Sequence, residues 1–80
     1  MLSDVHITPC IEANVLRAFK ELRRHRVAHG DIRSANIIVR DDESVVIVDF
    51  ERGVLNASDP MLAEEREKVK GTLQFLKTKS

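Results

Sequence analysis

The stretch from His29 to Glu51 reads HGDIRSANIIVRDDESVVIVDFE and decides the fold of the chain. Its two β-branched runs predict strands, and the charged residues between them predict a short turn. The predicted strands are Ile37–Val39 and Val45–Val48, and the turn is Arg40–Ser44. Two strands joined in this way lie side by side, so the start of the first and the end of the second meet at one end of the hairpin. We therefore expect Asn36 and Asp49 to lie close together.

The segment before the first strand adds a third polar side chain to this end of the hairpin. Asp31 lies one short loop before Asn36, and Gly30 allows a sharp turn because glycine adopts backbone angles that are closed to other residues. The side chains of Asp31, Asn36 and Asp49 can thus converge on one small volume. Carboxylate and amide oxygens are ligands that suit magnesium. The stretch therefore predicts a magnesium phosphate site.

A helix is predicted before this stretch. Thr8 followed by Pro9 is typical of a helix start, because threonine caps free backbone N–H groups and proline needs none at the first position. Apolar residues then recur at helical spacing over about four turns, at Ile11, Val15, Ala18, Phe19 and Leu22. The basic cluster Arg23–Arg26 is expected in the last turn, where it complements the helix dipole. Contact with phosphate or nucleic acid is its alternative role. Residues 1–7 show no pattern, and we expect a frayed lead-in there.

A second helix is predicted after a loop at residues 52–58. Ser58 or Asp59 before Pro60 signals its start, and we expect it over about residues 60–78. Its apolar face consists of Leu62, Val69, Leu73 and Leu76. The chain is therefore predicted to be one α+β domain over residues 1–80, in the order helix, hairpin, helix. Both faces of the hairpin should be buried, one of them by the first helix.

The composition limits the classes of partner. The 80 residues include 13 basic and 13 acidic side chains, so no net field attracts nucleic acid or an anionic membrane. The single cysteine, Cys10, can form neither an intrachain disulfide nor a cysteine metal cluster, which favours a reducing, cytoplasmic location. Apolar runs are at most four residues long, so neither a signal peptide nor a membrane span is expected.

The polar residues of the central stretch are of the types that phosphoryl transfer uses. This reaction needs metal on the nucleotide phosphates and an acceptor hydroxyl held in line, with little covalent work by the protein. Asn36 and Asp49 are suited to hold magnesium, and Asp31 is suited to orient the hydroxyl and accept its proton. Arg33 lies two positions after Asp31 and can neutralise charge on the transferred group.

The same residues resemble the catalytic segment of protein-kinase-like phosphotransferases. His29, Asp31 and Asn36 match the catalytic-loop pattern of that superfamily. Asp49 and Phe50 are similar to the start of its DFG element, and the spacing of 13 positions between Asn36 and Asp49 also agrees. The loop sequence HGD is closest to choline-kinase-like and aminoglycoside-phosphotransferase-like enzymes and to small kinase-like proteins of fungi.

The resemblance implies part of the C-terminal lobe of the kinase fold. It implies Asp31 as the catalytic base, Asn36 and Asp49 as the ligands of magnesium and ATP, Arg33 as a phosphate contact and His29 as a structural brace. The implied activity is phosphoryl transfer from ATP to a hydroxyl acceptor. The chain has no glycine-rich phosphate loop, and only 28 residues precede His29. We therefore expect a truncated or fragmentary kinase that is not active alone.

Two other interpretations stay open. In the first, the chain is a non-catalytic kinase-like remnant, or pseudokinase, whose apolar helix faces bind another protein. In the second, Asp31, Asn36 and Asp49 only cap turns and a strand end, as these residue types commonly do. The joint spacing of the three residues favours the kinase interpretation, whose catalytic segment covers about residues 9–51.

Overall fold

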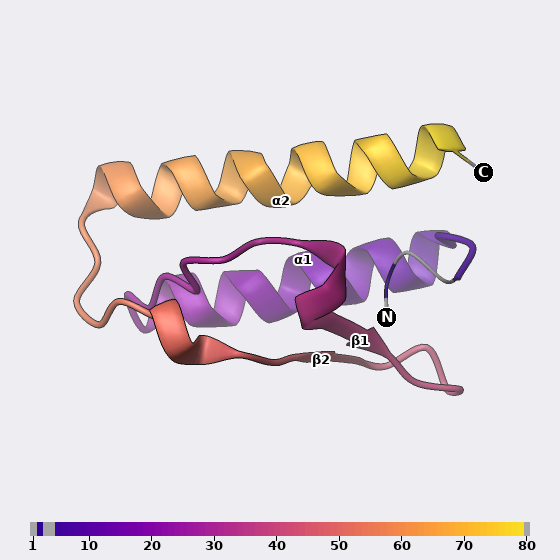
Figure 1. Ribbon diagram of the computed structural model, residues 1–80, viewed down its shortest axis with the longest axis horizontal. Coiled ribbons are helices and arrows are strands. Elements are labelled where there is room, and N and C mark those ends of the chain that lie inside the picture. The colour runs from indigo at the N-terminus through magenta and orange to yellow at the C-terminus, as the bar shows by residue number, and fades with distance from the viewer. Residues whose placement is uncertain (1, 3–4, 80) are drawn as a thin grey trace.

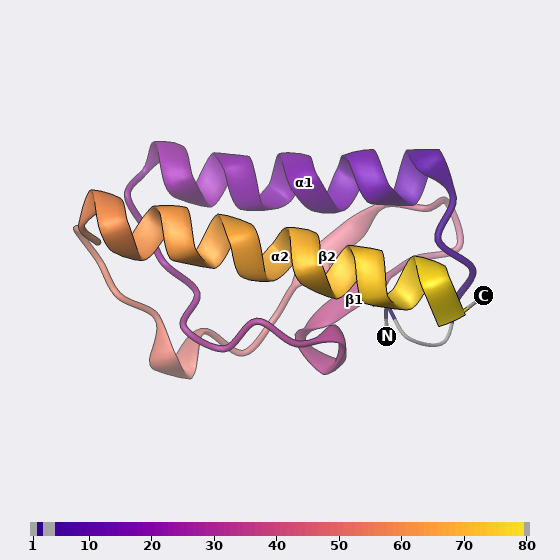
Figure 2. The same cartoon turned by 90° about the horizontal axis from the view of Figure 1, so that it is seen from above.

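The computed structural model describes Leu2 and residues 5–79, and it confirms the predicted α+β order (Figure 1). Helix α1 spans Pro9–Arg24, strand β1 spans Ile37–Val39, strand β2 spans Val45–Ile47 and helix α2 spans Asp59–Lys79. Two short 3₁₀ turns, η2 at Ser34–Asn36 and η3 at Phe50–Arg52, flank the hairpin. The two helices run antiparallel, and the hairpin packs on α1 (Figures 1 and 2).

Helix α1 begins where the sequence predicts. The hydroxyl of Thr8 accepts a hydrogen bond from the Ile11 N–H at 3.1 Å, and Pro9 is the first helical residue. Ile11, Val15 and Phe19 are buried. The predicted apolar face is therefore the face that packs into the core.

The end of α1 differs from the prediction. Arg26 has a left-handed backbone with φ 56°, and the Val27 N–H donates to the Leu22 carbonyl at 2.9 Å, which closes the helix. Only the first two residues of the cluster Arg23–Arg26 lie in the last turn, so the prediction is wrong for the other two. The guanidinium of Arg26 instead pairs with the Asp59 carboxylate at the start of α2, at 2.6 Å.

The hairpin buries one of its faces. Its antiparallel register pairs Ile37 with Ile47 and Val39 with Val45. These side chains pack with α1 in the main core. On the opposite face, Ile38 and Val46 are half-buried and belong to neither described core cluster. The prediction of a hairpin buried on both faces is therefore wrong for this side, and β2 ends one residue earlier than predicted.

Helix α2 begins at a serine cap. The Ser58 hydroxyl accepts a hydrogen bond from the Met61 N–H at 3.4 Å, which distinguishes Ser58 from Asp59 as the cap. The predicted apolar face is confirmed, because it packs into the core through Leu62, Val69, Leu73 and Leu76. Within the described residues, neither helix combines the length and apolarity that crossing a membrane requires.

The main core joins α1, the hairpin and α2, and it also includes part of the N-terminal segment. Leu2 is 0% exposed and Ile7 is 8% exposed. The prediction of a frayed lead-in is wrong at these two positions, whereas residues 1, 3 and 4 lie outside the described part of the chain. A smaller cluster of Ala28, Ala57 and Leu62 packs where the loops meet the start of α2.

Candidate functional site

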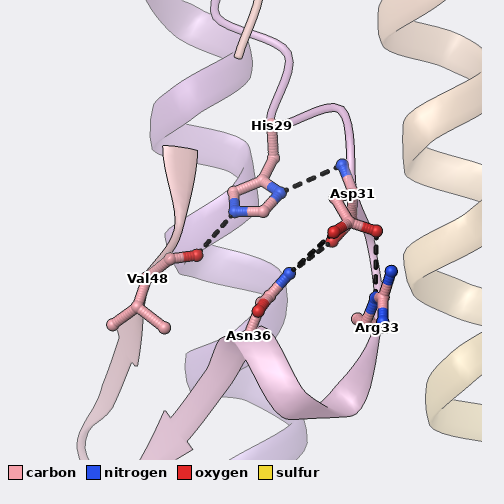
Figure 3. A network of polar contacts seen from close by, with 5 residues as sticks. All are labelled: His29, Asp31, Arg33, Asn36 and Val48. Carbon is pink, nitrogen blue, oxygen red and sulfur yellow. Dashed lines mark hydrogen bonds and ion pairs between the residues drawn. The ribbon is translucent and has the colours of Figure 1, made fainter. Parts of the chain in front are cut away.

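His29 connects the loop before β1 to the end of β2. Its side chain is 1% exposed, and its Nδ1 accepts a hydrogen bond from the Asp31 N–H at 3.2 Å. Because Nδ1 is an acceptor, the ring proton lies on Nε2, which donates to the Val48 carbonyl at 2.7 Å (Figure 3). This geometry agrees with the predicted role of His29 as a brace.

Gly30 makes the sharp turn that the sequence predicts. Its φ is +89°, and a Cβ atom at this position would overlap the carbonyl oxygen of Arg52. Arg52 lies so close because Ala28 and Val54 exchange two backbone hydrogen bonds, of 3.0 and 2.8 Å. Glycine is therefore required both by the backbone angle and by the close approach.

Helix α2 holds the same loop through Glu65. Its Oε1 accepts a hydrogen bond from the His29 N–H at 2.9 Å, and its Oε2 accepts one from the Gly30 N–H at 3.1 Å. Two such bonds to one carboxylate fix the loop relative to α2. Glu65 is absent from the predicted site, although a signal exists in the sequence. It lies three residues after Leu62 and four before Val69, so it is a charged residue on the apolar face of the helix.

Asp31 and Asn36 are in direct contact. The Nδ2 amide group of Asn36 donates to the Asp31 carbonyl at 3.0 Å and to its carboxylate Oδ2 at 3.3 Å (Figure 3). From the other side, the Nε–H of Arg33 donates to Oδ1 of Asp31 at 3.0 Å. The predicted base, its neighbouring cation and one predicted magnesium ligand thus form a single network.

These contacts keep Asp31 ionised. The hydrogen bond from Arg33 lowers the pKa of the Asp31 carboxyl below its ordinary value, and partial burial opposes this effect. The charge of Arg33, the hydrogen bond from Asn36 and the charge of Arg52 lower it further. The side chain of Asp31 is 23% exposed, so an acceptor hydroxyl can reach it. An ionised carboxylate is suited to orient a hydroxyl by accepting its hydrogen bond, whereas the lowered pKa makes it a weaker acceptor of the proton itself.

Asp49 reaches the same end of the hairpin through the backbone. The Val48 N–H donates to the Asn36 carbonyl at 2.9 Å, beyond the last strand pair, and Asp49 is the next residue. Its backbone is left-handed, with φ 64° and ψ 66°, a conformation that Asp tolerates better than most residues. The ring of Phe50 then packs edge-on against His29, with centroids 4.8 Å apart. No hydrogen bond joins the Asp49 carboxylate to another side chain in the described part of the chain.

Asn36 and Asp49 offer the kind of oxygen atoms that magnesium binds. Asn36 turns its amide nitrogen toward Asp31 and its Oδ1 away, and this oxygen accepts no hydrogen bond from any described residue (Figure 3). Among the described residues, no three His, Cys, Asp or Glu side chains are grouped to hold a metal ion, and Glu51 is exposed. One carboxylate and one amide oxygen suit magnesium only when water or phosphate supplies its other ligands. The donor types of Asn36 and Asp49 thus suit a magnesium ion only if a nucleotide or water completes its ligands.

No protein-family model, no curated protein and no solved structure matches this chain. The likeness to protein-kinase-like phosphotransferases thus stays a prediction from residue types and spacing. The contacts around Asp31 describe what chemistry the site can perform, and they do not show to which family the chain belongs.

Proposed function

We propose that the chain is the catalytic segment of a protein-kinase-like phosphotransferase, which binds ATP with magnesium and transfers a phosphoryl group to a hydroxyl acceptor. The observation that carries the proposal is the contact between Asp31 and Asn36. It joins an ionised carboxylate to a 7% exposed amide whose oxygen points away from Asp31, at the end of the hairpin that Asp49 follows. Of its two hydrogen bonds, the one to the Asp31 backbone carbonyl also suits a residue that only caps a turn, so the one to the carboxylate is what favours the proposal.

In this proposal each residue has a distinct task. Asp31 orients the acceptor hydroxyl and accepts its proton. Arg33 is 63% exposed at its side chain and uses its Nε–H on Asp31, so the outer part of its guanidinium is available to contact the phosphoryl group. Asn36 and Asp49 supply oxygens to magnesium, which when bound neutralises charge on the phosphates of ATP.

We further propose that these 80 residues do not turn over ATP alone and that they work in the cytoplasm. A nucleotide site needs an element that covers the phosphates, and the three glycines, Gly30, Gly53 and Gly71, do not form a glycine-rich loop. Ile38 and Val46 form a half-buried apolar surface. In this proposal the missing covering element, or the adenine ring of ATP, packs against it. The cytoplasm supplies ATP and keeps the single thiol of Cys10 reduced.

The test is a calorimetric titration of the full chain with ATP, in the presence and absence of magnesium. The variant Asp49→Asn removes one charge but keeps a residue type that tolerates the left-handed backbone. The matched control Asp41→Asn removes the same charge at an exposed position of the turn. We expect saturable, magnesium-dependent binding by the parent and by Asp41→Asn, and none by Asp49→Asn.

Three outcomes would change the proposal. No binding by a chain that circular dichroism shows to be folded would contradict it and favour the non-catalytic remnant that binds a protein. Equal binding by the parent and Asp49→Asn would contradict the role of Asp49. Turnover of radiolabelled ATP that Asp31→Asn abolishes would support the roles of the residues but contradict the statement that the chain is inactive alone.

A further inference from the structure

A groove with an apolar floor runs between α1 and α2, the two antiparallel helices seen side by side in Figure 2. Its volume is about 420 Å³. The floor consists of Ala13, Leu16, Phe19 and Val69. The rim consists of Arg17, Lys20, Arg23, Arg66 and Lys70. None of these residues belongs to the loop or the hairpin that carries the candidate site, so the groove is a separate feature of the molecule.

The five rim cations have no acidic partner among the described residues. None of them forms an ion pair with a described residue, and no acidic side chain lines the groove. Five other basic residues pair with carboxylates, at Arg24, Arg26, Arg33, Lys68 and Lys77, whereas Arg40 and Arg52, like the rim cations, form no ion pair with a described residue. In a chain whose charges sum to zero, five unneutralised cations around one groove are a local anion-attracting surface.

We propose that this groove binds an acidic amphipathic helix of a partner protein. Leu16 is 38% exposed at the floor, so it offers an apolar contact to one face of such a helix. The cations on both walls would face carboxylates on the flanks of that helix, because a helix that lies in a groove exposes its sides to both walls. The inference is independent of the proposed phosphoryl transfer.

An anionic membrane fits the same observations less well. Phe19 and Val69 are 5% and 2% exposed, so two of the four apolar lining residues are too deeply recessed to enter a flat bilayer. A partner helix that lies between the two rows of cations can contact the exposed side chains of Ala13 and Leu16.

The test measures binding of a fluorescein-labelled peptide by fluorescence anisotropy. The probe is a synthetic amphipathic helix about as long as α1, with leucine on one face and glutamate on both flanks. A second peptide has lysine in place of glutamate, and a third has the residues of the first in scrambled order. We expect the full chain to bind the first peptide only, with an affinity that falls as salt is raised.

Variants locate the binding to the groove. The combined change Lys20→Gln, Arg23→Gln and Lys70→Gln should weaken binding about tenfold, since three exposed charge pairs are lost. The control is Arg24→Gln, which adjoins Arg23 on the helix but lies outside the groove, and it should leave the affinity within about twofold. Leu16→Ser should also weaken binding, because it removes the apolar contact.

The proposal is overturned if the folded chain fails to bind the glutamate peptide at low salt. Equal loss of binding in the groove variant and in Arg24→Gln would place the contact elsewhere. Co-sedimentation with phosphatidylserine vesicles, without binding of the peptide, would assign the groove to a membrane and contradict the proposal. Circular dichroism spectra identical to that of the parent show that each variant is folded, so that differences in anisotropy report differences in peptide binding.

Discussion

Arg33 and Asp31 form an ion pair that makes the carboxylate of the proposed base harder to protonate. Because the folded-state pKa of Asp31 is lowered, its ionised carboxylate stabilises the loop at every pH above the unfolded pKa of about 4. This contribution is lost as the pH falls through the lower folded-state pKa. The contacts of Asp31 therefore stabilise the protein fully at neutral pH and weaken only in strong acid.

The change Arg33→Gln should raise the pKa of Asp31 toward its ordinary value. The hydrogen bond from Arg33 is the largest cause of the lowering, and its charge adds to it. A ¹³C NMR titration of the Asp31 carboxyl carbon in the parent and the variant measures the change. Arg40→Gln removes a charge from the turn between the strands and should leave the titration of Asp31 as it is. An unchanged midpoint in Arg33→Gln would mean that the ion pair does not form in solution.

Replacing Gly30 or Gly71 by alanine should change the free energy of unfolding in opposite directions. Gly30→Ala should destabilise the fold by roughly 2 kcal/mol or more, because its φ is +89° and the new Cβ meets the carbonyl of Arg52. Gly71→Ala should stabilise it by about 1 kcal/mol, because Gly71 lies inside α2 and an added Cβ meets nothing within 4 Å. Urea denaturation measures both changes. A destabilising Gly71→Ala would reveal a neighbour on that face of α2.

The residues of the site differ in how far the sequence encodes their positions. Gly30, Asn36 and Asp49 are predictable because each lies next to a turn or a strand whose pattern is local. Glu65 lies 35 positions from Gly30, which it holds. A single sequence carries no local signal for such a pair beyond a charge on an apolar helix face. The contact between Arg33 and Asp31 is local, but its geometry depends on side-chain conformations that spacing does not determine.

At the scale of elements, prediction succeeds where a pattern is periodic or a cap is present. Thr8 and the apolar spacing after it define the start and the buried face of α1. The end of α1 is not predictable in the same way, because Arg26 has a left-handed backbone conformation, which at helix ends is most often adopted by glycine. Leu2 and Ile7 enter the core without any periodicity, because tertiary packing alone decides the burial of isolated apolar residues.

Helix α2 positions the loop through Glu65, and this contact can be tested by a pair of conservative variants. Glu65→Gln replaces one acceptor oxygen with an amide donor, so one of the N–H groups of His29 and Gly30 loses its partner. We expect a loss of about 1–2 kcal/mol in the free energy of unfolding. Glu64→Gln is the control and should cost less than about 0.5 kcal/mol, since the exposed Glu64 pairs with Lys68 at 3.5 Å and with no other described residue.

Hydrogen exchange gives a second measure of the same contact. The amide groups of His29 and Gly30 should exchange faster in Glu65→Gln than in the parent, and their rates should be unchanged in Glu64→Gln. Equal stability of the two variants, with equal exchange rates, would contradict the role of Glu65 in holding the loop.

The whole molecule depends on one small main core. A domain of 80 residues is expected to have a net stability of roughly 4–12 kcal/mol. The core that supplies it includes side chains from the N-terminal segment, both helices and the hairpin. No element can therefore be removed without exposing the apolar faces of the others.

Leu73→Ala should bring the molecule close to unfolding. Leu73 is 2% exposed in the main core, and such a truncation typically costs about 2–5 kcal/mol. Leu55→Ala deletes the same atoms at a loop position that is 77% exposed, and it should change the stability by less than about 0.5 kcal/mol. Urea denaturation followed by circular dichroism compares the two. Similar midpoints would mean that α2 does not pack on α1 as described.

The hydrogen bonds of Glu65 also imply an order of events in folding. The helices and the hairpin each join residues that are near in sequence, whereas Glu65 reaches His29 across 36 positions. We expect the loop to reach its final conformation only after α2 has docked, so Glu65→Gln should speed unfolding and leave the refolding rate nearly unchanged in stopped-flow experiments. Slower refolding would place this contact before the rate-limiting step. On this account the loop that carries Asp31 is the last part of the molecule to assemble and the first to come apart.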